Sequence, residues 1–287
     1  MNDLPLVFDV QGSPVVGVLH RPETPPQVGI LMVAAGGPQY HVGCARQLLS
    51  WGRALSQAGF AVLRFDYRGM GDSGGEFKGF EQIDVDLKAA IDQLLEQQPS
   101  IKKVVLWGGC NAASAIMIYA WQDKRVDRII VSNPWAHTEA TEARLQVKYY
   151  YLQRLSQKTF WLKLLRGNLN IVQSWRSLAG ALQKMGGNQP QAAVDSTVSA
   201  ESNLHFVERM RLGLERYSGT MLLLLSGQSA MGREFDETVS ASRSWQQTVA
   251  KTDITRIEMP EAEHTFSTRE SQRAVLDAVL TWLDGAD

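Results

Sequence analysis

The chain has 287 residues, a length that suits one large α/β domain with an insertion and lets it bury a substantial core. Its 29 basic and 30 acidic residues nearly cancel and form no run of like charge, so neither nucleic acid nor an anionic membrane is indicated as a partner. The two cysteines, Cys44 and Cys110, are too few for a disulfide framework, and with the scattered histidines they do not make a tetrahedral zinc site.

The beginning of the chain, MNDLPLVFDVQG, lacks the basic region and the long apolar run of a signal peptide. The longest apolar stretch, at about residues 220–225, is too short to span a bilayer. We therefore expect no integral membrane segment, and a cytoplasmic location whose reducing conditions keep both thiols free.

The first half of the chain alternates short apolar runs with longer helix-like segments, the pattern of a mainly parallel sheet with helices on both faces. Residues 6–10 and 15–20 are predicted to form an opening hairpin around Gly12 and Ser13. The strands expected after it lie at residues 28–34, 61–66, 103–107 and 128–132. The helices expected between them lie at residues 46–58, 83–97 and 112–120.

From about residue 135 to residue 217 the pattern changes to amphipathic helical stretches without a clear strand. Alternation then resumes, with a strand at 220–226, a helix at 235–250, a strand at 254–259 and a final helix at 271–283. We therefore predict one α/β core, built from residues 1–134 and 218–287, with a helical lid insertion at 135–217.

The segment Trp107-Gly108-Gly109-Cys110-Asn111-Ala112 joins a predicted buried strand to a helix of small residues. A nucleophile at so tight a turn needs small residues two positions before it and two after it, which Gly108 and Ala112 provide for Cys110. The positive end of the following helix and a nearby imidazole would favour the thiolate. The alternative interpretation is a glycine-rich turn with a buried, inert cysteine.

Two further segments complete a candidate catalytic set. An oxyanion hole needs two backbone N–H groups aimed at one point, and we expect them from Asn111, after the nucleophile, and from Gly37, or else Gly36, after the 28–34 strand. An ordinary loop is the alternative for the glycines. His264 lies between the last strand and the last helix, the position of a general base when the chain order is nucleophile, acid, histidine.

Residues 66–73, Asp-Tyr-Arg-Gly-Met-Gly-Asp-Ser, resemble the D-x-R-G-x-G-x-S loop of α/β-hydrolases, and the turn at Cys110 and the late histidine match that superfamily as well. More narrowly, the chain resembles the first type of α/β-hydrolase associated with the exosortase A system. The matching segments are Gly-Gly-Pro-Gln-Tyr at 36–40, the turn at 107–112, Asn-Pro-Trp at 133–135, Tyr-Tyr-Tyr-Leu-Gln at 149–153 and His-Thr-Phe-Ser at 264–267.

The superfamily resemblance implies the α/β-hydrolase fold, with a lid over the strand ends that carry the site. The narrower resemblance implies a bacterial protein linked to exopolysaccharide production and protein sorting, and it implies no substrate. Arg68, Asp72 and Ser73 of the resembling loop are expected to stabilise a turn, and Cys44 is expected to be structural.

The chain departs from the resemblance at the acid. Relatives are expected to carry Asp near position 229, where this chain has Ser229. A thiol is a stronger acid than a hydroxyl, so a Cys–His pair needs less help from a carboxylate. We therefore expect a Cys110–His264 dyad oriented by Ser229 or by one of the nearby carboxylates, Glu234, Asp236 and Glu263.

These residues together predict hydrolysis of a small-molecule ester, thioester or related acyl substrate, without cofactor or metal. Tyr40 and Trp135 lie nearest the predicted site in sequence and are candidates for the substrate pocket. One alternative is transfer of the acyl group to another acceptor in polysaccharide assembly. The other is a degenerate hydrolase retained as a binding or scaffold protein, which the missing Asp at position 229 favours.

Overall fold

The computed structural model describes residues 2–36, 40–138 and 203–285. Among these residues it has a sheet of eight strands in the order β1-β2-β4-β3-β5-β6-β7-β8. β2 pairs antiparallel with both β1 and β4, and every other pair is parallel. The strands are β1 (Asn2–Val10), β2 (Ser13–Arg21), β3 (Val28–Val33), β4 (Ala61–Asp66), β5 (Lys103–Gly109), β6 (Val126–Ser132), β7 (Thr220–Ser226) and β8 (Asp253–Met259).

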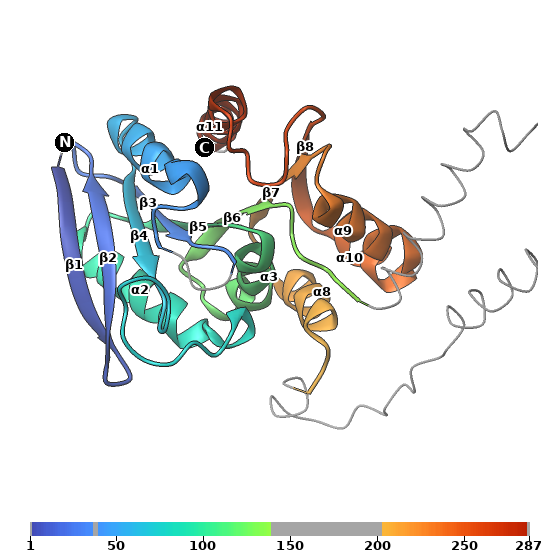
Figure 1. Ribbon diagram of the computed structural model, residues 1–287, viewed down its shortest axis with the longest axis horizontal. Coiled ribbons are helices and arrows are strands. Elements are labelled where there is room, and N and C mark those ends of the chain that lie inside the picture. The colour runs from blue at the N-terminus through green and yellow to red at the C-terminus, as the bar shows by residue number, and fades with distance from the viewer. Residues whose placement is uncertain (1, 37–39, 139–202, 286–287) are drawn as a thin grey trace, which may run out of the picture. The chain divides into compact units, whose positions relative to one another are not determined.

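Helices cover both faces of this sheet, which confirms the predicted α/β class. Figure 1 shows α1 and α11 on one face and α2, α3 and α8 on the other. The helices are α1 (Gln47–Gln57), α2 (Asp84–Gln97), α3 (Cys110–Tyr119), α8 (Phe206–Arg216), α9 (Ala230–Ala241), α10 (Arg243–Lys251) and α11 (Arg269–Asp284). Three short 3-10 helices are η1 (Cys44–Arg46), η2 (Phe80–Gln82) and η3 (Ala120–Gln122).

The predicted opening hairpin is confirmed as the β1–β2 pair. Its two turn residues, Gln11 and Gly12, have φ values of 53° and 82°, so both lie in the left-handed region. A two-residue turn of this kind has the twist that matches the flanking strands, and it pairs Val10 with Ser13.

The single helix predicted at residues 235–250 is wrong, because the structure has two helices, α9 and α10, that meet at Ser242. Ser242 has an extended backbone, with φ −126° and ψ 120°, and its hydroxyl accepts a hydrogen bond from the Trp245 N–H at 3.4 Å. A serine that caps a new helix in this way ends the preceding one, because its own backbone leaves the helical region.

The chain divides into two compact units, one of residues 1–136 with 204–287 and one of residues 137–203. Most of the predicted lid, residues 139–202, lies outside the described residues, so the lid stays a prediction. α8 belongs to the sheet-bearing unit and packs closely on α3, because a Cβ added to Gly213 would collide with the Met117 carbonyl oxygen. No helix in the described ranges is long and apolar enough to cross a membrane.

The parallel strands β3, β5, β6, β7 and β8 all end at the same edge of the sheet. In open α/β sheets this edge is where functional side chains gather, because the loops that follow the strands converge there. Every candidate residue of the sequence analysis, including Tyr40, follows one of these five strands in the chain. The strand order therefore brings together segments that are far apart in the chain.

Candidate active site

The turn from β5 into α3 has the backbone of a nucleophile elbow. Cys110, the first residue of α3, has φ 53°, a left-handed value that is uncommon outside glycine, asparagine and aspartate. A Cβ added to Gly108 would lie 2.8 Å from Ile116 Cδ1 and 3.0 Å from Ala112 Cβ. The sequence requirement for small residues at 108 and 112 therefore has a direct steric cause.

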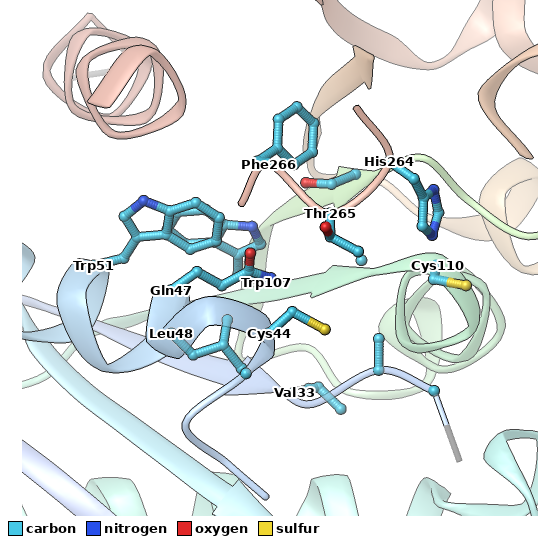
Figure 2. Close-up of a pocket in the computed structure, with 15 residues that line it drawn as sticks. Val33, Cys44, Gln47, Leu48, Trp51, Trp107, Cys110, His264, Thr265 and Phe266 are labelled. Carbon is cyan, nitrogen blue, oxygen red and sulfur yellow. The ribbon is translucent and has the colours of Figure 1, made fainter. Parts of the chain in front are cut away.

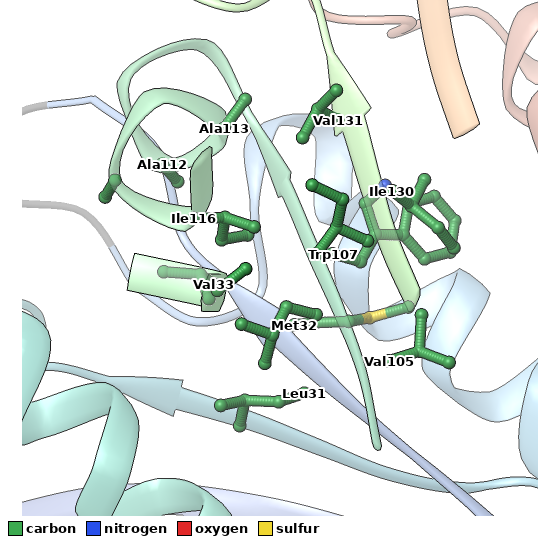
Figure 3. Packing of buried hydrophobic residues seen from close by; sticks show 14 of the residues in the cluster. Leu31, Met32, Val33, Val105, Trp107, Ala112, Ala113, Ile116, Ile130 and Val131 are labelled. Carbon is green, nitrogen blue, oxygen red and sulfur yellow. The ribbon is translucent and has the colours of Figure 1, made fainter. Parts of the chain in front are cut away.

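The residues on either side of Cys110 pack into the apolar core. Figure 3 shows Trp107, Ala112 and Ile116 packed among buried side chains of β3 and β6, including Val33 and Ile130. Each of these five side chains is at most 1% exposed. Close packing of this kind resists rearrangement, so it keeps Cys110 in its strained conformation.

Cys110 and His264 line one cavity of about 170 Å³. Figure 2 shows the imidazole of His264 directed toward the start of α3, where Cys110 lies. Both side chains are partly buried. Cys44, which was expected to be structural, lines the same cavity.

The ring of His264 is oriented by Ser229. The Nδ1 atom of His264 lies 2.8 Å from Ser229 Oγ. Ser229 is 1% exposed and caps α9, where its hydroxyl accepts a hydrogen bond from the Gly232 N–H at 3.2 Å. The cap uses one lone pair of the hydroxyl, and the other can accept a hydrogen bond from Nδ1–H. In that tautomer of His264, Nε2 is the free base.

The three carboxylates considered as alternatives to Ser229 for orienting His264 lie in other surroundings. Glu234 is buried in α9, and Asp236 forms an ion pair with Arg256 at 2.7 Å. Glu263 Oε2 accepts hydrogen bonds from the N–H of Thr265 at 2.6 Å and from its hydroxyl at 2.7 Å, and Oε1 accepts one from the Ser267 N–H. Burial raises the pKa of Glu263, but these hydrogen bonds outweigh it and lower the pKa to about 2.

Burial dominates the titration of both reactive side chains. It raises the pKa of Cys110 above its ordinary value, and the Asn111 backbone N–H opposes this by lowering it. It lowers the pKa of His264 below 6.5, while the negative charge of Glu263 raises it. Both shifts therefore favour a neutral thiol beside a neutral imidazole over the thiolate that the sequence argument favoured.

The thiol has a neighbour that the sequence analysis missed. Within the described residues, Cys110 Sγ donates a hydrogen bond to Met231 Sδ at 3.5 Å and not to His264. A thiol–thioether contact is weak, and rotation about the Cα–Cβ bond changes the direction of Sγ at small cost.

Of the two predicted oxyanion donors, Asn111 lies within the described residues. The Asn111 backbone N–H interacts with the Cys110 sulfur and lowers the pKa of the thiol, and its role as an oxyanion donor stays a prediction. Gly37 lies outside the described residues. The Asn111 side chain pairs with its neighbour Gly36, accepting from the Gly36 N–H at 2.8 Å and donating to the Gly36 carbonyl at 3.1 Å. This pair ties the loop after β3 to the elbow, a role that the sequence analysis did not assign.

Tyr40 and Trp135, the candidates for the substrate pocket, do not line this cavity. Tyr40 is 53% exposed. Trp135 packs against Phe80 and Phe206, with ring centroids 5.5 Å apart in both pairs. Their contact with substrate stays a prediction.

Asn133 is a positioning residue that sequence reasoning missed. It is 1% exposed and, with φ 45°, adopts the left-handed conformation that asparagine tolerates. Its Nδ2 donates to Ser226 Oγ at 2.6 Å and to the His264 carbonyl at 2.9 Å, and its Oδ1 accepts from the Ser226 N–H at 2.9 Å. The Asn-Pro-Trp segment at 133–135 was the available signal, but it carried only resemblance.

The loop after β4 stabilises a turn, as its motif suggested. The Arg68 guanidinium donates to both carboxylate oxygens of Asp86, at 2.9 and 2.8 Å. The Ser73 hydroxyl donates to the Asp66 carbonyl at 2.5 Å and accepts from the Val16 N–H at 2.8 Å. Nowhere in the described ranges do three or more His, Cys, Asp or Glu side chains form a group suited to a metal ion.

The strand order, the elbow and the late histidine together define an α/β-hydrolase. A family model described as serine aminopeptidase, S33, matches residues 29–268. The chain therefore belongs to this family of α/β-hydrolases, and the superfamily resemblance is confirmed. It departs from the family's description in having a cysteine at the elbow.

Solved structures of low identity share the fold. A thermostable carboxyl esterase from Bacillus coagulans aligns with 15% identity over 99% of both chains, with a TM-score of 0.64. A Pyrococcus furiosus esterase aligns with 13% identity over 98% of this chain and 91% of the other, with a TM-score of 0.60. An α/β serine hydrolase homologue from Coxiella burnetii aligns with 14% identity over 99% and 98%, with a TM-score of 0.57. No curated protein matches the chain significantly.

Replacing Asn133 tests its positioning role. We expect Asn133→Ala to lower the free energy of unfolding by about 1–3 kcal/mol, because the Ser226 N–H loses its buried partner. Asn133→Gly removes the same hydrogen bonds but suits the left-handed backbone, so it is expected to be less destabilising. Both variants are expected to lose esterase activity, since each releases the His264 carbonyl. Urea titration and kcat/KM measure the two effects, and wild-type values for both variants would contradict the assignment.

Proposed function

We propose that this α/β-hydrolase hydrolyses an ester, thioester or related acyl substrate, with Cys110 as nucleophile and His264 as general base. One observation carries the proposal: a cysteine with left-handed φ at an elbow shares a cavity with a histidine whose far nitrogen is already held by Ser229. An inert buried cysteine needs neither the strained backbone nor an oriented imidazole.

In the first half of the proposed reaction, His264 Nε2 takes the Cys110 proton as Sγ attacks the acyl carbon. The carbonyl oxygen becomes an oxyanion that accepts hydrogen bonds from the backbone N–H groups of Asn111 and Gly37. The imidazolium then donates its proton to the departing alcohol or thiol. The product of this half is a thioester between the acyl group and Cys110.

In the second half, His264 takes a proton from water as its oxygen attacks the thioester carbon. The same two N–H groups hold the second oxyanion. When the C–S bond breaks, the sulfur receives the proton from His264, the acid leaves, and the resting thiol and imidazole are restored. The pKa directions of both groups favour this neutral resting pair, so proton transfer accompanies attack.

In a catalytic triad, the acid both orients the histidine ring and stabilises its positive charge. In this proposal, two different residues perform these two functions. Ser229 orients the ring by accepting from Nδ1, but it carries no charge. Glu263 carries the charge: it stays ionised because its pKa is about 2, and it raises the pKa of His264 without a hydrogen bond to the ring among the described contacts. A thiol needs less assistance than a hydroxyl, so this weaker arrangement is compatible with cysteine at the elbow.

The sequence resemblance supports two finer proposals. One is that the substrate belongs to bacterial exopolysaccharide or exosortase systems, where transfer of the acyl group to a sugar or protein acceptor is the alternative to hydrolysis. The other is a cytoplasmic location, which is supported by the lack of a disulfide between the two cysteines, Cys44 and Cys110. A degenerate scaffold remains the non-enzymatic alternative, because Ser229 replaces the expected carboxylate.

Removing either reactive side chain tests the proposal. We expect Cys110→Ala and His264→Ala each to lower kcat/KM for p-nitrophenyl and thioester substrates by about 10³-fold or more. Mass spectrometry of the wild type quenched during turnover is expected to show an acyl adduct on the peptide that contains Cys110. Undiminished turnover in either variant would defeat the mechanism, and no adduct with any acyl donor would favour the scaffold.

A double-mutant cycle tests why serine is tolerated at position 229. We expect Cys110→Ser alone to be nearly inactive, because a hydroxyl needs a charged orienting group. Adding Ser229→Asp supplies that charge at the capping position, where Asp also caps helices well. The second substitution is expected to raise kcat/KM at least about tenfold in the Cys110→Ser background and to change the cysteine enzyme much less. Equal effects in both backgrounds would contradict the argument.

The pH dependence of kcat/KM tests the separate roles proposed for Ser229 and Glu263. Activity needs neutral His264, so it rises with pH through the pKa of that residue, which burial places below 6.5. Glu263→Gln removes a charge that raises this pKa, so the acid limb is expected to move to lower pH, with kcat reduced about threefold to tenfold. Ser229→Asp is expected to move the limb to higher pH. Glu261→Gln, which removes an exposed carboxylate, is the control, and a limb that is the same in all four proteins would contradict the assignment.

A further inference from the structure

The cavity beside Cys110 extends away from the reactive pair to a wall of two tryptophans. Figure 2 shows Cys110 and His264 at one side of it and Trp51 and Trp107 at the other. The two indole rings are stacked, with centroids 4.9 Å apart and planes 15° from parallel. A group attached to Cys110 that enters this cavity therefore meets an aromatic end wall.

The walls of this cavity are fixed in place. Trp51 is 4% exposed, and its Nε1 donates a hydrogen bond to the Gln272 carbonyl of α11 at 2.9 Å. Phe266 is 3% exposed and has φ 50°, a value that is strained for a bulky residue. Strain of this kind persists only where the surrounding structure enforces it, so the cavity is preorganised.

The size of the cavity limits what enters. Its volume is about 170 Å³ and its lining includes the apolar side chains of Val33, Leu48 and Phe266. An apolar cavity of roughly 150 Å³ holds one benzene molecule, which has six carbon atoms. The space therefore suits an acyl chain of about six carbons, and a long fatty acyl chain would have to extend out of it.

One polar atom distinguishes this cavity from a purely apolar one. Gln47, at the start of α1, lines it, and the Gln47 Oε1 atom is buried without a hydrogen-bond partner in the part of the chain that is described. A buried acceptor left in this state costs free energy, and a ligand that brings an N–H or O–H donor recovers it.

We propose that this cavity is the acyl pocket and that the natural acyl group has about six carbons and carries a hydrogen-bond donor for Gln47. The inference rests on the function proposed above. The occupant is the acyl group rather than the leaving group because the leaving group must depart before water attacks, whereas the acyl chain stays on Cys110. A pocket that ends at two buried tryptophans retains its occupant.

The first experiment varies the two ends of the substrate separately. With p-nitrophenyl esters from acetyl to decanoyl, kcat/KM is expected to rise by about fourfold per methylene up to hexanoyl and to fall at octanoyl. With hexanoyl esters of alcohols of different length, kcat/KM is expected to show no such optimum. An optimum that follows the alcohol, or none along the acyl series, overturns the pocket assignment while leaving the Cys110 mechanism intact.

Two variants and a control make the test specific. Trp51→Phe shortens the end wall and is expected to move the optimum toward octanoyl. Cys44→Leu fills part of the cavity and is expected to move it toward butyryl. Val7→Ala, an exposed position at 71%, is expected to leave the series unchanged. Thermal melts establish that each variant is folded, and an unchanged optimum in both folded pocket variants overturns the proposal.

A binding measurement separates this proposal from the catalytic one. In the Cys110→Ala protein, calorimetry is expected to show tighter binding of hexanoate than of acetate or decanoate. A further gain of about tenfold is expected for 3- or 6-hydroxyhexanoate, and adding Gln47→Met is expected to abolish it. Selective binding without turnover by the wild type would overturn the proposed function and keep the pocket. Turnover with equal binding of all chain lengths would do the reverse.

Discussion

The bend of the backbone at Cys110 is the constraint on which the rest of the site depends. The left-handed backbone of Cys110, between β5 and α3, projects the side chain at the sheet edge. This conformation persists because the small residues Gly108 and Ala112 let the turn pack tightly. The same bend aims the Asn111 N–H at the reacting atoms and lets the Asn111 side chain hold Gly36. One local conformation therefore positions the proposed nucleophile, one proposed oxyanion donor and the loop expected to supply the other.

The second requirement is that a histidine from near the end of the chain reaches this bend. The adjacent strands β6, β7 and β8 bring Asn133, Ser226 and His264 to one edge, and Asn133 links all three loops by hydrogen bonds. Ser229 then sets the rotation of the ring. Because each contact joins different loops, the geometry of the proposed dyad depends on the three adjacent strands β6, β7 and β8 rather than on any one segment.

Burial of Cys110 and His264 determines which protonation states the site favours. It makes charge unfavourable on both the thiol and the imidazole, so the proposed chemistry begins from neutral groups. In the proposed mechanism Glu263 supplies the charge that stabilises the imidazolium, and its carboxylate accepts hydrogen bonds from Thr265 and Ser267 in the His264 loop. A cysteine nucleophile is compatible with an uncharged orienting serine, because a thiol loses its proton more easily than a hydroxyl and needs less stabilisation of the imidazolium.

The sequence alone determined the alternating elements, the elbow at Cys110 and the position of His264, because these depend on residues within a few positions of one another. It failed at Ser242, where a side-chain cap divides one apolar pattern into two helices. Only the tertiary structure decided that Ser229, rather than three nearby carboxylates, faces His264, that Asn133 joins three loops, and that Cys44 and Gln47 line the cavity. Those contacts join residues far apart in the chain, and strand order, which no local pattern encodes, sets which of them meet.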